Sequence, residues 1–332
     1  MNPFSYLRPA TEQEAFAALA KPDTMALAGG TTLVDMMRLE VMRPQHVVDI
    51  TGLPLGKIEV GASSITLGAL ATNSEVAYHP EVVAKLPALA DAIRSGDSGQ
   101  LRNMATTSGN LLQRTRCPYF RDTASPCNKR SPGSGCAALE GFTRMNAIVG
   151  TSKACIAAHP SDMCVALVAL DAVVQLRSAG GARTVKLADF HTLPADHPHV
   201  ESVLQPGELV ISVEVPTTPL AASSRYVKVR DRASYAFALA SAAVALEVQA
   251  GTIKDARVVL GGVGTKPWRE PVVERALIGK PATSVTFTTA ANLALETPDL
   301  RPDNAFKVAL AKRLIARALG LVAAPRAAGG SK

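Results

Sequence analysis

The chain has 332 residues, of which 47% are hydrophobic and only 4% aromatic, and its formal net charge is +7. This length predicts two or three domains, and no signal peptide or apolar stretch long enough to cross a bilayer is present. The basic residues are dispersed without interleaved aromatic residues, so neither a nucleic-acid interface nor a membrane span is expected.

The first part of the chain predicts a compact β-loop-α-β unit over residues 24–50. Thr11 and Glu14 form a T-x-x-E capping pattern before an apolar helix. A strand over 24–28 then meets two glycines and a helix that ends near Met42. Between this unit and residue 216, we expect strands at 58–60, 65–68, 173–177, 184–187 and 209–215, helices at 74–77, 82–94 and 161–171, and a loop over 100–110.

Pro216-Thr217-Thr218-Pro219 predicts a domain boundary, because two prolines so close together interrupt regular structure. The residues beyond it indicate a smaller α+β domain. The tail over 323–332 is rich in Ala, Pro, Gly and Ser and is expected to be disordered. In the last domain, we expect strands at 225–229, 243–249 and 256–260 and helices at 272–277, 290–295 and 304–319.

Four of the five cysteines lie close together in the middle of the chain: Cys117, Cys127, Cys136 and Cys155. The stretch that holds them is rich in proline and glycine, so it is expected to be a long loop. Such a loop needs an anchor, and four thiolates around a metal centre would supply one. The wide spacing lacks the close C-x2-4-C pairs of structural zinc sites and favours a [4Fe-4S] cluster, with zinc and disulfides as the alternatives.

The charge around the first three of these cysteines suits an anionic cluster, because basic residues outnumber acidic ones. Only Asp122 is acidic between Leu112 and Cys136. Cys164 lies apart from the set in an apolar run, and we expect it to be a small buried hydrophobe. The basic residues between Leu112 and Cys136 are Arg114, Arg116, Arg121, Lys129 and Arg130.

Three separated clusters of glycine and polar residues indicate a nucleotide site. The first, 28–33, places Gly29 and Gly30 between a strand and a helix, where a backbone can approach a pyrophosphate, although a bare glycine pair is more often only a turn. The second is 106–110 and the third is 159–162. Asp162 in the third cluster could bind ribose or ribityl hydroxyls, or could serve only as a helix-start charge.

The combination of AGGTTL, TTSGNL and HPSD in these clusters resembles the FAD-binding subunit of the molybdenum hydroxylases, the xanthine dehydrogenase and aldehyde oxidase family. The stretch 228–239 looks like the family's approach to the flavin ring, and 260–263 resembles its following glycine pair. The resemblance runs from about Phe4 to Leu319. The cysteine-containing insertion resembles two branches, the 4-hydroxybenzoyl-CoA reductase β subunit and, more closely in wording, the FAD subunit of bacterial periplasmic aldehyde oxidoreductase.

This resemblance implies an α+β fold. Residues 1–217 would form a two-part FAD-binding domain of the PCMH/vanillyl-alcohol-oxidase type, with a [4Fe-4S] insertion loop at about 112–157. Residues 222–322 would form the C-terminal domain of the molybdenum hydroxylase flavoprotein type, a three-stranded sheet with helices. The resemblance also strengthens the interpretation of Cys117, Cys127, Cys136 and Cys155 as cluster ligands.

The same resemblance implies which residues meet the cofactor. Lys228 would lie near the isoalloxazine, and Tyr235 would lie over the flavin face, where its alternative role is that of a core aromatic. Val210 would touch the adenine end, and Ser161 and Asp162 the ribityl-phosphate region. The diphosphate would be held by Ala26, Leu27, Ala28, Gly29, Gly30, Thr31, Thr32, Leu33, Thr107, Ser108, Gly109 and Asn110.

The function that the resemblance implies is electron transfer through FAD and [4Fe-4S] in a heterotrimeric molybdenum-dependent aldehyde oxidoreductase. The chain has no molybdopterin signature and no plant-type [2Fe-2S] motif, so we expect those cofactors on a large molybdenum subunit and a small [2Fe-2S] subunit. A benzoyl-CoA reductase-like subunit and, from another class, a nucleotide-binding module with structural zinc are the alternatives. Without a signal of its own, the chain is expected to be cytoplasmic or to reach the periplasm by co-export with a partner subunit.

Overall fold

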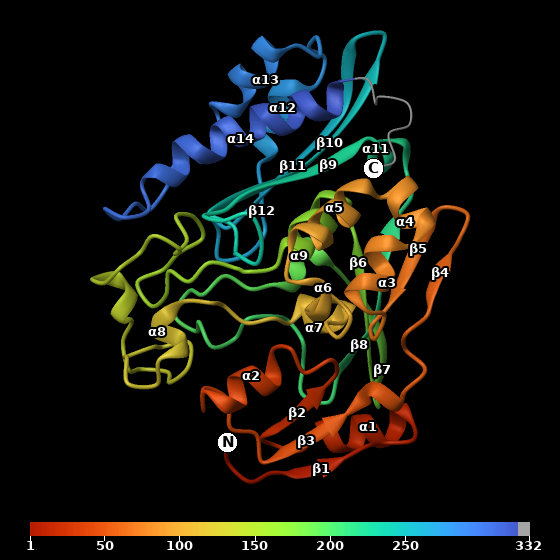
Figure 1. Cartoon of the computed structure of the whole chain (residues 1–332), viewed down its shortest axis with the longest axis vertical. Helices are drawn as coiled ribbons and strands as arrows, with labels where there is room; N and C mark the ends of the chain where they lie inside the picture. The colour runs from red at the N-terminus through yellow and green to blue at the C-terminus, as the bar shows by residue number, and fades with distance from the viewer. Residues whose placement is uncertain (325–332) are drawn as a thin grey trace.

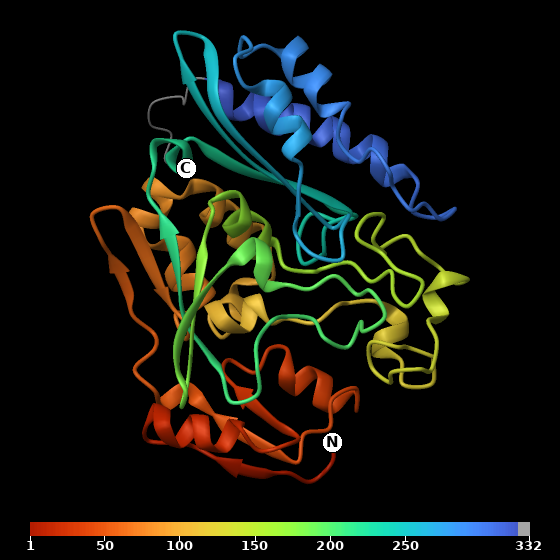
Figure 2. The same cartoon turned by 180° about the vertical axis from the view of Figure 1, so that it is seen from behind.

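The computed structural model describes residues 1–324 and arranges them as three units, with the N-terminal unit at the bottom of Figure 1 and the C-terminal unit at the top. Each unit is built on its own sheet. The stretch 112–157, called the cysteine segment below, projects from one side of this stack, as the view from behind also shows (Figure 2). The predicted disordered tail lies outside the described residues except for Ala323, which is helical, and Ala324.

The N-terminal unit is a three-stranded parallel sheet in the order β1-β3-β2. Parallel strands cannot be joined by a tight hairpin, so the chain crosses over between β2 and β3 through α2, and the predicted β-loop-α-β unit is confirmed. The elements are β1 (Ser5–Leu7), α1 (Glu12–Leu19), β2 (Thr24–Leu27), α2 (Leu33–Arg38), β3 (His46–Asp49) and a 3-10 helix (Ile50–Gly52).

The middle unit is a five-stranded antiparallel sheet in the order β4-β5-β8-β6-β7. The chain leaves this unit for the cysteine segment and then returns to it. The last strand of the unit in the sequence, β8, pairs between β5 and β6. The elements are β4 (Ile58–Val60), β5 (Ser64–Gly68), α3 (Asn73–Tyr78), α4 (Pro80–Lys85), α5 (Pro87–Ser95), α6 (Gly99–Arg102), α7 (Thr107–Leu111), α9 (Asp162–Ala169), β6 (Val173–Ser178), β7 (Gly181–Lys186), α10 (Leu187–Phe190) and β8 (Leu209–Pro216).

Two predictions about the helices of this unit are wrong. The single helix expected over 82–94 is divided into α4 and α5, because Pro87 lacks a backbone N–H and forces Leu86 out of the helical conformation. The loop expected over 100–110 instead contains α6 and α7. Thr106 is the N-cap of α7, because its hydroxyl accepts a hydrogen bond from Gly109 N. The polar composition of this stretch favoured a loop instead.

The C-terminal unit is an antiparallel sheet in the order β12-β11-β10-β9, in which the three long strands match the prediction and β12 adds two residues. The helices that follow β12 in the chain lie on one face of this sheet (Figure 1). The helix expected at 290–295 lies earlier in the chain, as α13. The elements are α11 (Pro219–Ala222), β9 (Ser224–Val229), β10 (Ala240–Gln249), β11 (Thr252–Gly261), β12 (Trp268–Arg269), α12 (Pro271–Leu277), α13 (Ser284–Ala291) and α14 (Phe306–Ala323).

The cysteine segment has more internal order than its composition indicates. It contains α8 (Pro118–Arg121) and a 3-10 helix (Ala137–Leu139). Its own small apolar core includes Phe120 and also Met36 from α2. Arg130 donates hydrogen bonds to the carbonyls of Tyr119 and Phe120, at 2.8 and 2.7 Å, so a single guanidinium closes the first turn of the segment.

The far end of the cysteine segment is attached to the C-terminal unit. Lys307 in α14 is fully buried, and its ammonium donates to Asn146 O at 2.9 Å and to Gly262 O at 2.7 Å. Burial lowers the pKa of Lys307 to about 7. Asn304 adds a hydrogen bond to Ala147 O. The cysteine segment begins and ends at the middle unit, and its turn at Asn146 is bound by Lys307 of α14.

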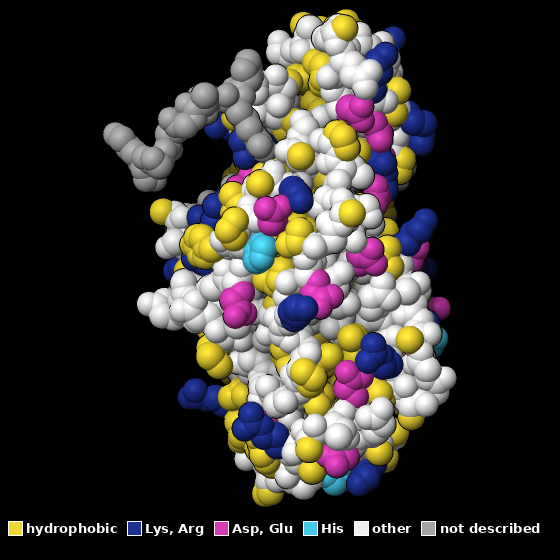
Figure 3. Space-filling model, turned by 90° about the vertical axis from the view of Figure 1, so that its right-hand side faces the viewer, with side chains coloured by type: hydrophobic (Ala, Val, Ile, Leu, Met, Phe, Trp, Pro, Cys, Tyr) yellow, Lys and Arg dark blue, Asp and Glu magenta, His cyan; other side chains and the backbone are white. Residues whose placement is uncertain are grey.

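Charged side chains of both signs are interspersed over the face of the molecule in Figure 3, which shows no continuous basic surface. The basic excess of the sequence is thus spread out on this face. Among the described residues, no helix combines the length and the apolar character that crossing a bilayer would require.

Candidate functional site

Two adjacent cavities lie between the N-terminal unit, the middle unit and the cysteine segment. Cavity 1 has a volume of about 520 Å³ and cavity 2 of about 510 Å³. Each is within the usual size of a ligand pocket, and together they offer room for a ligand of dinucleotide size. The residues that line both cavities, and so mark where they meet, are Thr31, Thr32, Gly109, Gln113 and Pro160.

The first predicted cluster forms a wall of cavity 1. Gly30 has a φ of +72°, a conformation that favours glycine. Gly29 lies so close to the neighbouring chain that a Cβ added there would be 1.7 Å from Met104 O. The glycine pair therefore allows the loop to pack tightly against another loop. Of the predicted residues 26–33, all except Leu27 line cavity 1.

The second predicted cluster is divided between the cavities and the interior. Gly109 lines both cavities and Asn110 lines cavity 2. Ser108 lines cavity 1, but its hydroxyl donates to Ala69 O at 2.9 Å. Thr107 is fully buried, lines neither cavity and donates to Ala71 O. The structure thus removes the Thr107 side chain from the predicted ligand contacts, because the first turn of α7 directs it toward the core.

The third predicted cluster places a charged group at cavity 2. Ser161 is buried and caps α9 by accepting from Cys164 N, so it supports the site from behind and lines neither large cavity. Asp162 lines cavity 2 and accepts from Lys228 Nζ at 2.6 Å and from the Tyr226 hydroxyl. Burial, and then Asp162, raise the pKa of Tyr226 well above its usual value, so Tyr226 stays a neutral donor.

The two remaining predicted residues also reach the cavities. Val210 lines cavity 1, and Tyr235 lines cavity 2. Tyr235 is 52% exposed, so its alternative role as a core aromatic is wrong. Its φ of +53° is an uncommon conformation for a side chain of this size, and such residues concentrate at functional sites. The Arg232 guanidinium lies over the Tyr235 ring, 5.6 Å from its centroid.

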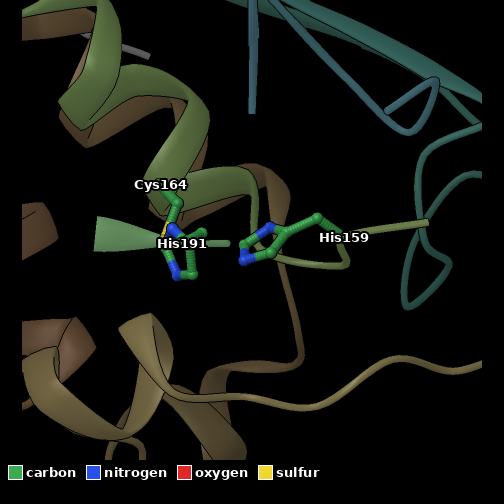
Figure 4. A group of neighbouring side chains, drawn as sticks. All are labelled: His159, Cys164 and His191. Carbon is green, nitrogen blue, oxygen red and sulfur yellow. The ribbon is translucent and has the colours of Figure 1, made fainter. Parts of the chain in front are cut away.

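His159, His191 and Cys164 lie close together, as Figure 4 shows, and both histidines line cavity 1. Their ligand-type atoms lie within 4.8 Å of one another. His159 Nδ1 accepts from Ser161 N, so the neutral ring carries its proton on Nε2, where a metal ligand would need a lone pair. Burial raises the pKa of the Cys164 thiol to about 12. The arrangement therefore suits hydrogen bonding and core packing better than metal binding, as predicted for Cys164.

Four buried polar atoms that line these cavities have no hydrogen-bond partner among the described residues. In cavity 1 they are His159 Nε2 and His191 Nδ1, and in cavity 2 they are Asn73 Oδ1 and Arg116 Nε. Buried polar groups are almost always paired, so these four enclosed atoms are exceptions in the walls of the two cavities. The sequence interpretation missed Asn73, Arg116 and His191, which lie outside the three predicted clusters.

The structure brings the four segment cysteines (Cys117, Cys127, Cys136 and Cys155) together. Cys117, Cys127 and Cys155 belong to the apolar core of the cysteine segment, and Cys136 packs against it; all four are free cysteines in this structure. Cys127 and Cys136 face each other in an antiparallel bridge. Burial is the main cause that raises the pKa of Cys155 to about 11, and Cys136 and Cys117 contribute in the same direction.

The basic residues of the segment have partners that the sequence did not indicate. Lys129 Nζ and Arg114 Nε bind the two oxygens of Glu201, at 2.8 and 2.5 Å. Lys129, Cys155 and Glu201 all line cavity 1. Asp35 of α2 accepts from Arg121. These cations therefore do more than offset the charge of a cluster: they fasten the cysteine segment to the walls of the cavities.

The two histidines predict a pH dependence of stability. Burial lowers the pKa of His191 to about 4 and that of His159 well below 6.5. Below pH 6.5 the unfolded chain takes up protons that the folded chain does not, so stability falls as the pH decreases from 6.5 to 4. From His191 alone, the free energy of unfolding is expected to fall by about 2 kcal/mol between pH 7 and pH 5, measured by urea unfolding.

A matched pair of variants separates this contribution from that of the carboxylates. His191→Gln is expected to lose much of the pH dependence between pH 7 and pH 5, whatever its absolute stability. His197→Gln, which changes an exposed histidine of the same loop, should keep the wild-type dependence. An unchanged slope in His191→Gln would show that the buried imidazole does not cause the effect.

Comparisons with known proteins match two family models to successive parts of the chain. Residues 2–218 match the model of the FAD binding domain in molybdopterin dehydrogenase. Residues 225–322 match the model of the CO dehydrogenase flavoprotein C-terminal domain. The alternative of a nucleotide-binding regulatory module with structural zinc is therefore wrong at the level of the protein class. The glycine loop and the combined size of the two cavities fit the flavin nucleotide that this family binds.

Individual relatives and solved structures belong to the same kinds of protein as the two family models. The chain is 49% identical to the aldehyde oxidoreductase FAD-binding subunit PaoB of Escherichia coli over 96% of this chain and 98% of that protein. It is 32% identical to the glyceraldehyde dehydrogenase medium chain of Sulfolobus acidocaldarius, covering 83% and 82%. Its structure resembles quinoline 2-oxidoreductase from Pseudomonas putida 86 and carbon monoxide dehydrogenase from Hydrogenophaga pseudoflava, each with a TM-score of 0.75, 25% identity and 96% coverage of both chains. The chain belongs to the FAD-binding medium subunits of the molybdenum hydroxylase family, a family of oxidoreductases.

Proposed function

We propose that the chain is the FAD- and [4Fe-4S]-containing electron-transfer subunit of a heterotrimeric molybdenum-dependent aldehyde oxidoreductase. One FAD would extend through cavities 1 and 2, and one [4Fe-4S] cluster would be bound by the four segment cysteines. A small [2Fe-2S] subunit would deliver electrons that a large molybdenum subunit takes from an aldehyde. The aldehyde is inferred from the 49% identity to a subunit of an aldehyde oxidoreductase.

The observation that carries this proposal is the position of the four segment cysteines. They gather as free thiols in one apolar core, and Cys155 also lines cavity 1. Sulfur ligands in an apolar, largely buried setting are typical of iron-sulfur clusters. A cluster at this place would lie beside the flavin nucleotide, which suits transfer of electrons between the two.

The residues of the chain bind and orient, whereas reversible electron uptake is the chemistry that FAD and the cluster supply when bound. Gly29 and Gly30 shape the loop that holds the diphosphate. Lys228 and Tyr226 donate to the Asp162 carboxylate and hold it oriented at cavity 2. Tyr235 covers the open side of cavity 2, and we expect this ring to hinder a nicotinamide, so that NAD is a poor acceptor.

Co-purification of the chain with its two partner subunits tests the proposal. Acid denaturation is expected to release one FAD per chain into the supernatant, because no cysteine or histidine lies within residues 26–33 to bond it covalently. Addition of an aldehyde should bleach the flavin absorbance of the assembled complex but not that of the isolated chain. If the assembled, FAD-loaded complex does not bleach with any aldehyde tried, the chain does not serve an aldehyde oxidoreductase.

A further inference from the structure

Arg116 is the last residue before Cys117, and its side chain lies at the boundary between the cysteine segment and cavity 2. The guanidinium is mostly buried, and it lies over the Phe237 ring at 5.4 Å from the centroid. Its Nε–H is buried without a hydrogen-bond partner among the described residues. A guanidinium carries five donors. Because Nε is enclosed by protein, a ligand in cavity 2 would meet the Nη donors, of which Nη1 reaches Asp35 Oδ2 at 3.3 Å.

Most of the other charged side chains that line cavity 2 already have a partner of opposite charge. Lys228 is bound to Asp162 at 2.6 Å. Arg121 holds both oxygens of Asp35, at 2.8 and 3.1 Å, whereas Arg116 reaches the same carboxylate only at 3.3 Å. Asp97 makes no ion pair within residues 1–324; burial raises its pKa, and Arg116 is among the cations that lower it. The charged residues that line cavity 2 are Asp35, Asp97, Arg116, Arg121, Asp162 and Lys228.

The chemistry of a bound flavin explains a cation with unused donors at this place. Two electrons, which the proposed complex takes from its substrate, and one proton from water convert an isoalloxazine into an anion, whose negative charge lies on the pyrimidine ring. The carbonyl and nitrogen acceptors along one edge of that ring match the planar donor set of a guanidinium. Cavity 2, which holds Lys228 and Tyr235, is the end of the site where the isoalloxazine is expected.

We propose that Arg116 compensates the negative charge of the reduced flavin and thereby favours its reduced form. This inference rests on the proposed function, since it requires FAD in cavities 1 and 2. Arg116 would thus raise the midpoint potential of the flavin, although it belongs to the cysteine segment and is next to Cys117 in the sequence. Arg116 lines cavity 2 and directly precedes Cys117, so it connects the flavin site to the cysteine segment along the chain.

Reductive titration of the assembled complex, followed at the flavin absorbance, tests this role. Arg116→Gln is expected to lower the affinity for reduced FAD relative to oxidised FAD at least tenfold, which is a decrease of about 30 mV in the flavin midpoint potential for a two-electron couple. The affinity for oxidised FAD, measured by flavin release on dilution, should change less than about threefold. Arg116→Lys keeps the charge and should recover a large part of the potential.

The matched control is Arg144→Gln, which removes an arginine of the same segment that pairs with Asp231 and lines none of the cavities described. It should leave the potential unchanged. If Arg116 had only a structural role, its replacement would lower the affinities for oxidised and reduced FAD equally. That result, or an unchanged flavin potential in flavin-loaded Arg116→Gln, overturns the inference. If Arg116→Gln does not retain flavin, Arg116→Lys decides the question. A wild-type flavin potential in Arg116→Lys supports a charge effect, whereas complete loss of flavin from Arg116→Lys refutes the inference. A wild-type complex without FAD would instead refute the proposed function.

Discussion

Replacing any one of the four segment cysteines by serine is expected to remove most of the iron and acid-labile sulfide, from about four of each per chain in the wild type. These cysteines form part of the segment's own apolar core, so a missing ligand would also loosen the segment. Flavin content should fall with the iron, because Lys129 and Cys155 of the segment line cavity 1. Iron, sulfide and flavin analysis of the four purified variants provides the measurement.

Cys164→Ser is the matched control for this series. Its thiol is fully buried in the first turn of α9 and lies in a different core from the four segment cysteines. Iron and sulfide should stay at wild-type levels, while the buried hydroxyl costs about 1–3 kcal/mol of stability. Zinc without sulfide in the wild type, or iron loss in Cys164→Ser alone, would contradict the proposed ligand set.

The second large effect is expected at Gly29. Gly29→Ala places a methyl group 1.7 Å from Met104 O, which is backbone and cannot move aside without shifting the loop. We expect loss of most FAD affinity and about 3 kcal/mol of stability. Gly30→Ala should be milder, because its cost comes from a φ of +72° and a side-chain contact with Val34 at 3.2 Å. FAD titration and urea unfolding measure both effects.

Gly320→Ala is the control for these glycine variants. Gly320 lies inside α14 with open space around it, so the added methyl group meets nothing within 4 Å. Alanine also favours a helix over glycine, and we expect stability to rise by about 1 kcal/mol with FAD affinity unchanged. Wild-type FAD affinity in Gly29→Ala would show that the tight loop contact is not needed for the nucleotide site.

The parts of the molecule that follow from local physics could be predicted from the sequence. The crossover around α2, the cap of α9 by Ser161 and the three long strands of the last sheet all depend on nearby residues and are confirmed. The division between α4 and α5 also had a local cause in Pro87, which the helical pattern of apolar residues concealed. Patterns of apolar residues therefore need to be read together with the prolines that interrupt them.

The partners within the site could not be predicted, because they come from distant parts of the chain. Glu201, which binds Arg114 and Lys129, lies in a loop before β8, and nothing in its local sequence indicates a buried ion pair. Thr107 resembles a ligand residue in sequence, yet the helical turn directs its hydroxyl to Ala71 O. The residue types of the three clusters could be identified as ligand-binding from the sequence. The direction of each side chain could not, because it depends on tertiary packing.

The attachment of the cysteine segment to Lys307 has a consequence for the order of events during synthesis. The ribosome makes residues 112–157 long before it makes α14, so for much of translation Asn146 O lacks the ammonium that holds it in the finished protein. The segment reaches its final arrangement only after the last helix has emerged and docked. Any group bound by the segment cysteines in that arrangement is therefore enclosed after the polypeptide is essentially complete.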